Sequence, residues 1–122
     1  MILETELLEQ PAELRRILAH EIFHFVWVRL GNPRRRAWEE LLAAERGRRE
    51  AGWSAAVLRS SLTEADRRRR NRRWREYVCE SFCDTAAWLY AGADTECELG
   101  RRARERRRRW FAENLATGAL PV

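Results

Sequence analysis

Lysine is absent from this chain of 122 residues, so its 24 basic residues are all arginines. Nineteen acidic residues offset most of that charge and leave a net charge of +5. Arginine without lysine, beside abundant alanine, leucine and glutamate, indicates a compositional habit of the source genome rather than selection for one polyanionic ligand. The basic balance is therefore weak support for a nucleic-acid-binding protein.

Cysteines and long apolar runs are also few. The three cysteines are an odd number, which does not predict a disulfide framework. The longest mainly apolar stretch, Ile22 to Val28, is far shorter than the roughly 20 residues that a membrane span needs. The N-terminus lacks the charged, apolar and small-residue regions of a signal peptide. From these absences we expect a soluble, cytoplasmic protein with no membrane segment.

The residues that are present predict a single folded domain over residues 1–122. Hydrophobic residues make up 45% of the chain and include six tryptophans, which is the composition of a globular rather than a disordered protein. A chain of this length is long enough for one hydrophobic core but not for two.

Helical periodicity and breaker residues predict a mainly α fold. Pro11 suits the first turn of a helix, Gly31 suits a C-terminal cap, and Thr-Glu-Ala-Asp at residues 63–66 is a capping box. We expect a compact four-helix domain, with helices at residues 11–30, 33–49, 63–90 and 98–115. Residues 52–58 have no helix start signal and are expected to form a loop or short strand, and residues 2–8 a strand or extended arm. At most one short strand or hairpin therefore accompanies the helices.

The only two histidines of the chain, His20 and His24, stand in the pattern H-E-x-x-H together with Glu21. On a helix, residues four apart share a face, with Cβ atoms about 5–6 Å apart. Two imidazoles so placed can bind one zinc ion, and Glu21 can reach a metal-bound water without binding the metal itself. Zinc lowers the pKa of that water to about 7, and the glutamate takes its proton as general base. The alternative is that two histidines on a buried helix are satisfied by backbone carbonyls. The apolar run around His24 predicts a helix buried on every side, where histidines have few water partners and a metal is a natural way to satisfy them.

A third protein ligand is expected, because catalytic zinc sites usually have three plus a water. No further histidine exists, so the candidates are a carboxylate or a thiolate. Glu80 and Asp84 lie four apart on one face of a helix, in its apolar half, where two carboxylates are costly unless a cation meets them. We expect Glu80 to complete the ligand set and Asp84 to accept the N–H of a ligand imidazole. The alternative for Glu80 is an ion pair with an arginine, in which case Cys83 is the fallback ligand.

H-E-x-x-H on one helix, followed by E-x-x-x-D on a later helix, resembles the gluzincin metallopeptidases, and the short chain is similar to the minimal gluzincins of bacteria. The matching segments, residues 17–30 and 77–90, cover about a quarter of the chain. The resemblance implies that His20, His24 and Glu80 are the zinc ligands. It also implies that Glu21 acts as general base and then as general acid, and that Asp84 lies behind a ligand histidine.

Three further side chains near Glu80 could belong to the site. Tyr77 lies three residues before Glu80 on the same helical face, so its O–H could donate to the oxyanion of a tetrahedral intermediate. The alternative for Tyr77 is a core aromatic residue with a polar tip. Cys79 and Cys83 lie on a face rotated by about 100° from that of Glu80 and Asp84, and we expect buried free thiols there.

Together these features predict a zinc-dependent hydrolase, most simply a peptidase acting on a peptide or protein substrate. One alternative is a metal-holding domain without turnover. Another is an arginine-rich nucleic-acid-binding module, because residues 67–75 and 101–109 are strongly cationic. Interleaved acids such as Glu76 and Glu105 favour solvated helix faces over that alternative.

Overall fold

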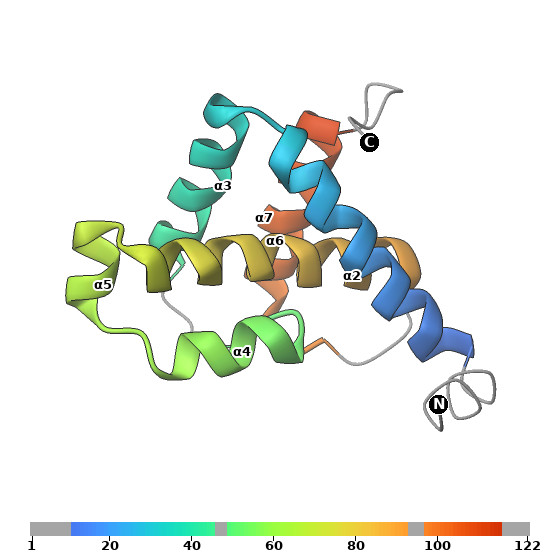
Figure 1. Ribbon diagram of the computed structural model, residues 1–122. Coiled ribbons are helices and arrows are strands. Elements are labelled where there is room, and N and C mark those ends of the chain that lie inside the picture. The colour runs from blue at the N-terminus through green and yellow to red at the C-terminus, as the bar shows by residue number, and fades with distance from the viewer. Residues whose placement is uncertain (1–10, 46–48, 93–96, 116–122) are drawn as a thin grey trace.

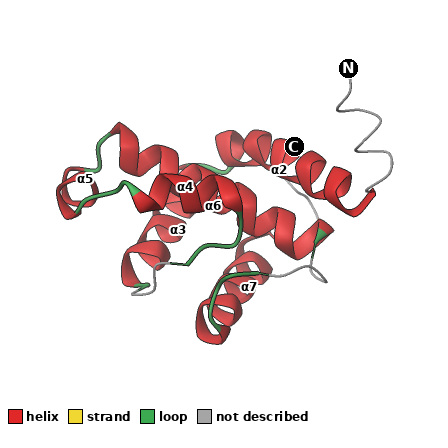
Figure 2. Ribbon diagram, turned by 90° about the horizontal axis from the view of Figure 1, so that it is seen from below, coloured by secondary structure: helices red, strands yellow, loops and turns green. Residues whose placement is uncertain are grey.

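The computed structural model describes residues 11–45, 49–92 and 97–115, which form helices joined by short loops (Figure 1 and Figure 2). Six helices lie in this part of the chain, and none of its residues is in a strand. They are, in chain order, α2 (Pro11–Arg29), α3 (Asn32–Ala44), α4 (Trp53–Ser60), α5 (Glu64–Arg69), α6 (Arg72–Ala91) and α7 (Arg101–Leu115). The mainly α fold class is confirmed, with six helices where four were predicted. The strand or arm predicted at residues 2–8 lies outside the described residues.

The central helix of the molecule is α6. Every residue from Ser81 to Trp88 is buried, which covers more than two full turns and therefore all sides of the helix. The four helices α2, α3, α4 and α5 all contact it. In Figure 1 it runs across the middle of the molecule, with α2 passing across it and α4 below it. Side chains on α6 are thus the ones that several other elements can reach.

The histidine-bearing helix α2 buries one face only. Its buried residues are Phe23 and Val26, whereas Phe25 and Val28 are 59% and 68% exposed. The prediction that this helix is buried on every side is therefore wrong. Since α6 occupies the centre, α2 lies at the periphery and leaves apolar side chains on the surface.

The long helix predicted at residues 63–90 is two helices in the structure. The capping box predicted at Thr63 is present at the start of α5. The break falls at Arg70, whose backbone is left-handed with a φ of 47°. The guanidinium of Arg70 donates two hydrogen bonds, of 2.6 and 2.7 Å, to the Glu39 carboxylate on α3. Asn71 then caps α6 by accepting a backbone N–H of its first turn, as asparagine commonly does.

Residues 52–58, predicted as a loop or short strand, belong to α4 and its N-cap. Gly52 precedes the helix and offers no side-chain cap. Instead, the backbone N–H of Ala55 donates a 2.8 Å hydrogen bond to the Asp84 carboxylate, which α6 supplies. A carboxylate at this end also meets the positive end of the helix dipole. The stabilising group is 29 residues away in the chain, so the local sequence carries no sign of it.

Aromatic side chains fill the core between α3, α6 and α7. The ring of Trp38 lies 5.0 Å from that of Trp110 and 5.4 Å from that of Phe111, centroid to centroid. Phe82 stacks on Phe111 at 5.2 Å.

Helix α3 ends at Ala44, earlier than the predicted residue 49. In the described part of the chain, no helix combines the length and the apolar character needed to cross a membrane.

Candidate metal centre

The candidate centre lies where α2 packs along α6 and three side chains converge. The Nε2 atom of His20 lies 3.1 Å from the Nε2 atom of His24. The Glu80 carboxylate reaches both rings, at 2.9 Å from His20 Nε2 and 3.4 Å from His24 Nε2. The structure thus brings together the two histidines of α2 and the carboxylate of α6 that the sequence predicted as partners.

The spacing of these atoms is close to the spacing of zinc ligands. Zinc bonds nitrogen and oxygen at about 2.0–2.1 Å in a tetrahedron, so its ligand atoms lie about 3.3–3.4 Å apart. The three contacts above, of 2.9, 3.1 and 3.4 Å, come within about 0.5 Å of that spacing and are also the lengths of hydrogen bonds. One oxygen of Glu80, Oε2, is buried and lies 2.9 Å from His20 Nε2. A buried carboxylate needs a positive partner, and either a protonated His20 or a cation bound between the rings would supply one.

Asp84 fixes the orientation of the His20 ring. The Nδ1–H of His20 donates to Asp84 Oδ1 at 2.8 Å, while Asp84 Oδ2 accepts from the backbone of Ala55. With Nδ1 engaged in this way, Nε2 is the nitrogen left to face Glu80 and His24. A carboxylate behind a ligand imidazole is the arrangement that orients histidines in metal sites.

The electrostatics of the centre call for a positive charge. The hydrogen bond to Asp84, followed by that to Glu80, raises the pKa of His20 to about 10, although burial opposes the shift. The hydrogen bond from His20 in turn lowers the pKa of Glu80, again against the effect of burial. Without a metal, a proton on His20 therefore supplies the charge that two carboxylates demand. A metal ion at Nε2 would take the place of that proton.

Two thiols lie beside the histidines. The Sγ of Cys83 and a ring nitrogen from each histidine all lie within 4.8 Å of one another. Cys83 is fully buried, and its hydrogen bond with Cys79, together with burial, raises its pKa far above the ordinary value. Cys79 is half-buried and its Sγ lies 3.7 Å from Nδ1 of His24. Both thiols are free. Glu80 is the nearer third donor, and Cys83 is the second candidate.

Glu21 occupies the exposed edge of the centre. It is one residue from His20 on α2, its side chain is solvent-accessible, and it forms no ion pair within the described residues. The position is compatible with a general base that is not a metal ligand.

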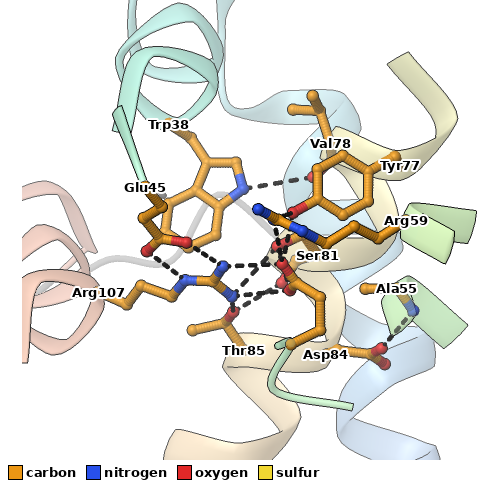
Figure 3. A network of polar contacts seen from close by, with 11 residues as sticks. Trp38, Glu45, Ala55, Arg59, Tyr77, Val78, Ser81, Asp84, Thr85 and Arg107 are labelled. Carbon is orange, nitrogen blue, oxygen red and sulfur yellow. Dashed lines mark hydrogen bonds and ion pairs between the residues drawn. The ribbon is translucent and has the colours of Figure 1, made fainter. Parts of the chain in front are cut away.

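Tyr77 does not join this group. Its side chain is 1% exposed, and its hydroxyl donates to the Glu50 carboxylate and accepts from Arg59 (Figure 3). Because its proton is directed to Glu50, the hydroxyl is not placed to donate to an oxyanion at the histidines. Burial, together with the charge of Glu50, raises its pKa above the ordinary range. The structure corresponds to the alternative of a core aromatic residue with a polar tip.

A buried arginine in the same network was missed by the sequence analysis, which assigned residues 101–109 to a solvated face. Arg107 on α7 is 0% exposed. Its guanidinium donates to Glu45 at 2.6 and 2.9 Å and to Glu50 at 2.9 Å from each of two nitrogens (Figure 3). The helical register carried a signal, since residue 107 is four after Ala103 and three before Trp110 and so lies on the apolar face.

No family model, curated protein or solved structure matches the chain. The resemblance to gluzincins therefore stands on the two motifs alone, and function has to be argued from the chemistry of the side chains described above.

Proposed function

We propose that this protein is a zinc-dependent hydrolase that acts on peptides, with His20, His24 and Glu80 as the ligands of the ion. The supporting observation is the convergence of two imidazole nitrogens and one carboxylate, from two helices, at contacts of 2.9 to 3.4 Å. The burial of Glu80 Oε2 beside His20 Nε2 adds to it. An ion pair of Glu80 with an arginine, the competing explanation, finds no counterpart among the ion pairs of the described residues.

The chain's own residues then divide the chemistry among them. Zinc, when bound, supplies a Lewis acid and lowers the pKa of a water to about 7. Glu21 takes the proton of the attacking water and returns it to the leaving amine, which is the part a glutamate plays in H-E-x-x-H peptidases. Asp84 holds the His20 ring so that its Nε2 stays directed at the ion.

A metal-holding domain without turnover is the second candidate. The observation that favours it is the position of Tyr77, whose hydroxyl is engaged by Glu50 and leaves the proposed oxyanion without that donor. The nucleic-acid alternative gains less, because several arginines of the cationic helices are paired with acids: Arg70 with Glu39, Arg72 with Glu76, and Arg101 with Glu105.

Metal content and peptide hydrolysis, measured on the purified chain, test the proposal together. We expect about one zinc per chain, and hydrolysis that Glu21→Gln abolishes while the zinc is retained. Glu80→Ala should weaken zinc binding by orders of magnitude, whereas the matched control Glu76→Ala, one turn earlier on α6 and exposed, should leave it unchanged.

Three outcomes separate the alternatives. Zinc bound without hydrolysis of any peptide would favour the metal-holding domain. Loss of zinc in Cys83→Ser but not in Glu80→Ala would assign the third place to the thiolate, which cobalt substitution would also report as a sulfur-to-metal charge-transfer band. Absence of zinc, with binding to DNA or RNA that falls steeply with salt, would refute the proposal in favour of the nucleic-acid alternative.

A further inference from the structure

The outward face of α2 carries large apolar side chains that remain on the surface. Their exposed fractions run from 41% to 68%. The face opposite them carries the buried Phe23 and Val26, so they are not part of the core. They are Ile17, Leu18, Ile22, Phe25 and Val28. The proposed base, Glu21, projects from the middle of this apolar surface. Surface side chains of this kind, gathered on one face, mark a binding site.

Two of these residues border the candidate metal centre. An α-helix turns by about 100° per residue, so Val28 lies about 40° around α2 from His24. By the same geometry Ile17 lies about 60° from His20, also on the exposed side. Ile22 lies about 160° from both histidines and faces away from the centre. The apolar surface therefore has a side next to the histidines and a side remote from them.

The start of α4 borders the centre from the other direction. Asp84 joins the two, since one of its oxygens accepts from His20 and the other from the backbone of Ala55, each at 2.8 Å. Trp53, two residues before Ala55, is 79% exposed, and Val57, one turn after Trp53, is 46% exposed. In Figure 1 the beginning of α4 is turned toward α2, below α6. The histidines thus lie between two sets of exposed apolar side chains.

We infer that the substrate is a peptide segment with large aliphatic or aromatic side chains on both sides of the bond that is cleaved, bound between Val28 on α2 and Trp53 on α4. The inference rests on the proposed function and names its substrate class. Residues 11–45, 49–92 and 97–115 contain no strand edge to pair with a peptide backbone. The exposed side chains that flank the histidines in this part of the chain are apolar, and they offer a peptide hydrophobic contacts.

A second copy of the chain is a poorer occupant of this surface. A two-fold interface buries the same patch of both chains, so two Glu21 carboxylates would be desolvated next to one another without a cation. Burying an unpaired carboxylate is strongly unfavourable. A peptide bound across the centre instead leaves Glu21 beside the bond that it acts on.

The test measures peptide binding separately from hydrolysis. Zinc-loaded Glu21→Gln, which should bind without cleaving, is titrated with two fluorescein-labelled peptides of one length and charge, one carrying leucine and phenylalanine around the central bond and the other serine. We expect the apolar peptide to bind at least tenfold more tightly. Val28→Ser and Trp53→Ser in this background should each weaken its binding about tenfold, with zinc content unchanged.

Ile22→Ser is the matched control, because it removes an aliphatic side chain that is 47% exposed from the remote side of α2. Equal affinity for the two peptides, or an equal loss in Ile22→Ser, would overturn the inference even if the wild type hydrolyses peptides. A preference for the apolar peptide without any hydrolysis by the wild type would support a peptide-binding surface at Val28 and Trp53 but refute the hydrolase, and with it the assignment of that peptide as a substrate. Dimerisation at micromolar concentration that Val28→Ser abolishes would assign the surface to a second copy and overturn the inference as well.

Discussion

Replacing Arg107 by methionine tests the buried charge cluster that this residue forms with Glu45 and Glu50. The change keeps most of the side-chain volume and removes the guanidinium. In the structure that group is fully buried and is the partner of two carboxylates, Glu45 and Glu50, which are themselves 8% and 1% exposed. It also donates to the hydroxyls of Ser81 and Thr85, at 3.2 and 3.0 Å. The variant leaves all four acceptors without their shared donor.

The size of the loss follows from which charges remain without a partner. Arg59 still contacts Glu50 at 3.2 Å, so part of that charge stays compensated, whereas Glu45 loses its two hydrogen bonds from Arg107. Removing one partner of a buried ion pair costs about 3–5 kcal/mol. For a domain of this size, that corresponds to a fall in Tm of about 10–20 °C.

Urea and thermal unfolding followed by circular dichroism measure this loss. The control is Arg106→Met, the exposed neighbour on α7, which should change the free energy of unfolding by less than about 0.5 kcal/mol. Adding Glu45→Gln to Arg107→Met should recover part of the stability, because the orphaned charge is then gone. A loss below about 1 kcal/mol in Arg107→Met, or no difference from the Arg106 control, would refute the assignment of Arg107 to a buried structural role.

Two further predictions concern Asp84 and Glu50. Asp84→Asn should weaken zinc binding by about 10–100-fold, because it removes the partner that orients His20. A competition titration with a chelating indicator measures the affinity, and an unchanged affinity would show that His20 is oriented without Asp84. The pKa of Glu50 lies below its ordinary 4.5, because the charge of Arg107 and three sets of hydrogen bonds outweigh burial. The stability that Glu50 contributes is thus present above pH 4.5 and lost as the pH falls through the lower folded-state pKa. Acid unfolding should be less steep below pH 4.5 in Glu50→Gln, and identical slopes for the two proteins would contradict the shift.

The features that could be predicted from the sequence are those whose cause is local. A proline at the first turn and a capping box act within a few residues, so the start of α2 at Pro11 and the start of α5 after its cap Thr63 lie where they were expected. The same holds for the grouping of the site residues. Spacings of four fix His20 with His24 on one face of a helix, whatever the rest of the fold does.

The features that were missed have causes far away in the chain. Helix α4 is capped by a carboxylate of α6, and Glu45 leaves α3 at its end to bind an arginine 62 residues later. The break between α5 and α6 is partly local, since Asn71 is a good cap, but the left-handed Arg70 is held by Glu39 of another helix. Propensity arguments cannot see such tertiary partners. Such tertiary partners are also the reason that composition alone could not tell which arginines of residues 101–109 are buried and which are solvated.

Helix α6 contributes side chains to two adjacent polar clusters in an otherwise apolar centre. Ser81 and Thr85, one turn apart, face the cluster whose positive charge Arg107 provides. Glu80 and Asp84, also one turn apart, face His20 and His24, where no arginine forms an ion pair within the described residues. Arg107 thus neutralises Glu45 and Glu50 at the first cluster, whereas the carboxylates of the second cluster, Glu80 and Asp84, face two histidines. Either a proton on His20 or a bound ion can supply the positive charge there, which is why metal content is the measurement that tests the proposed zinc site.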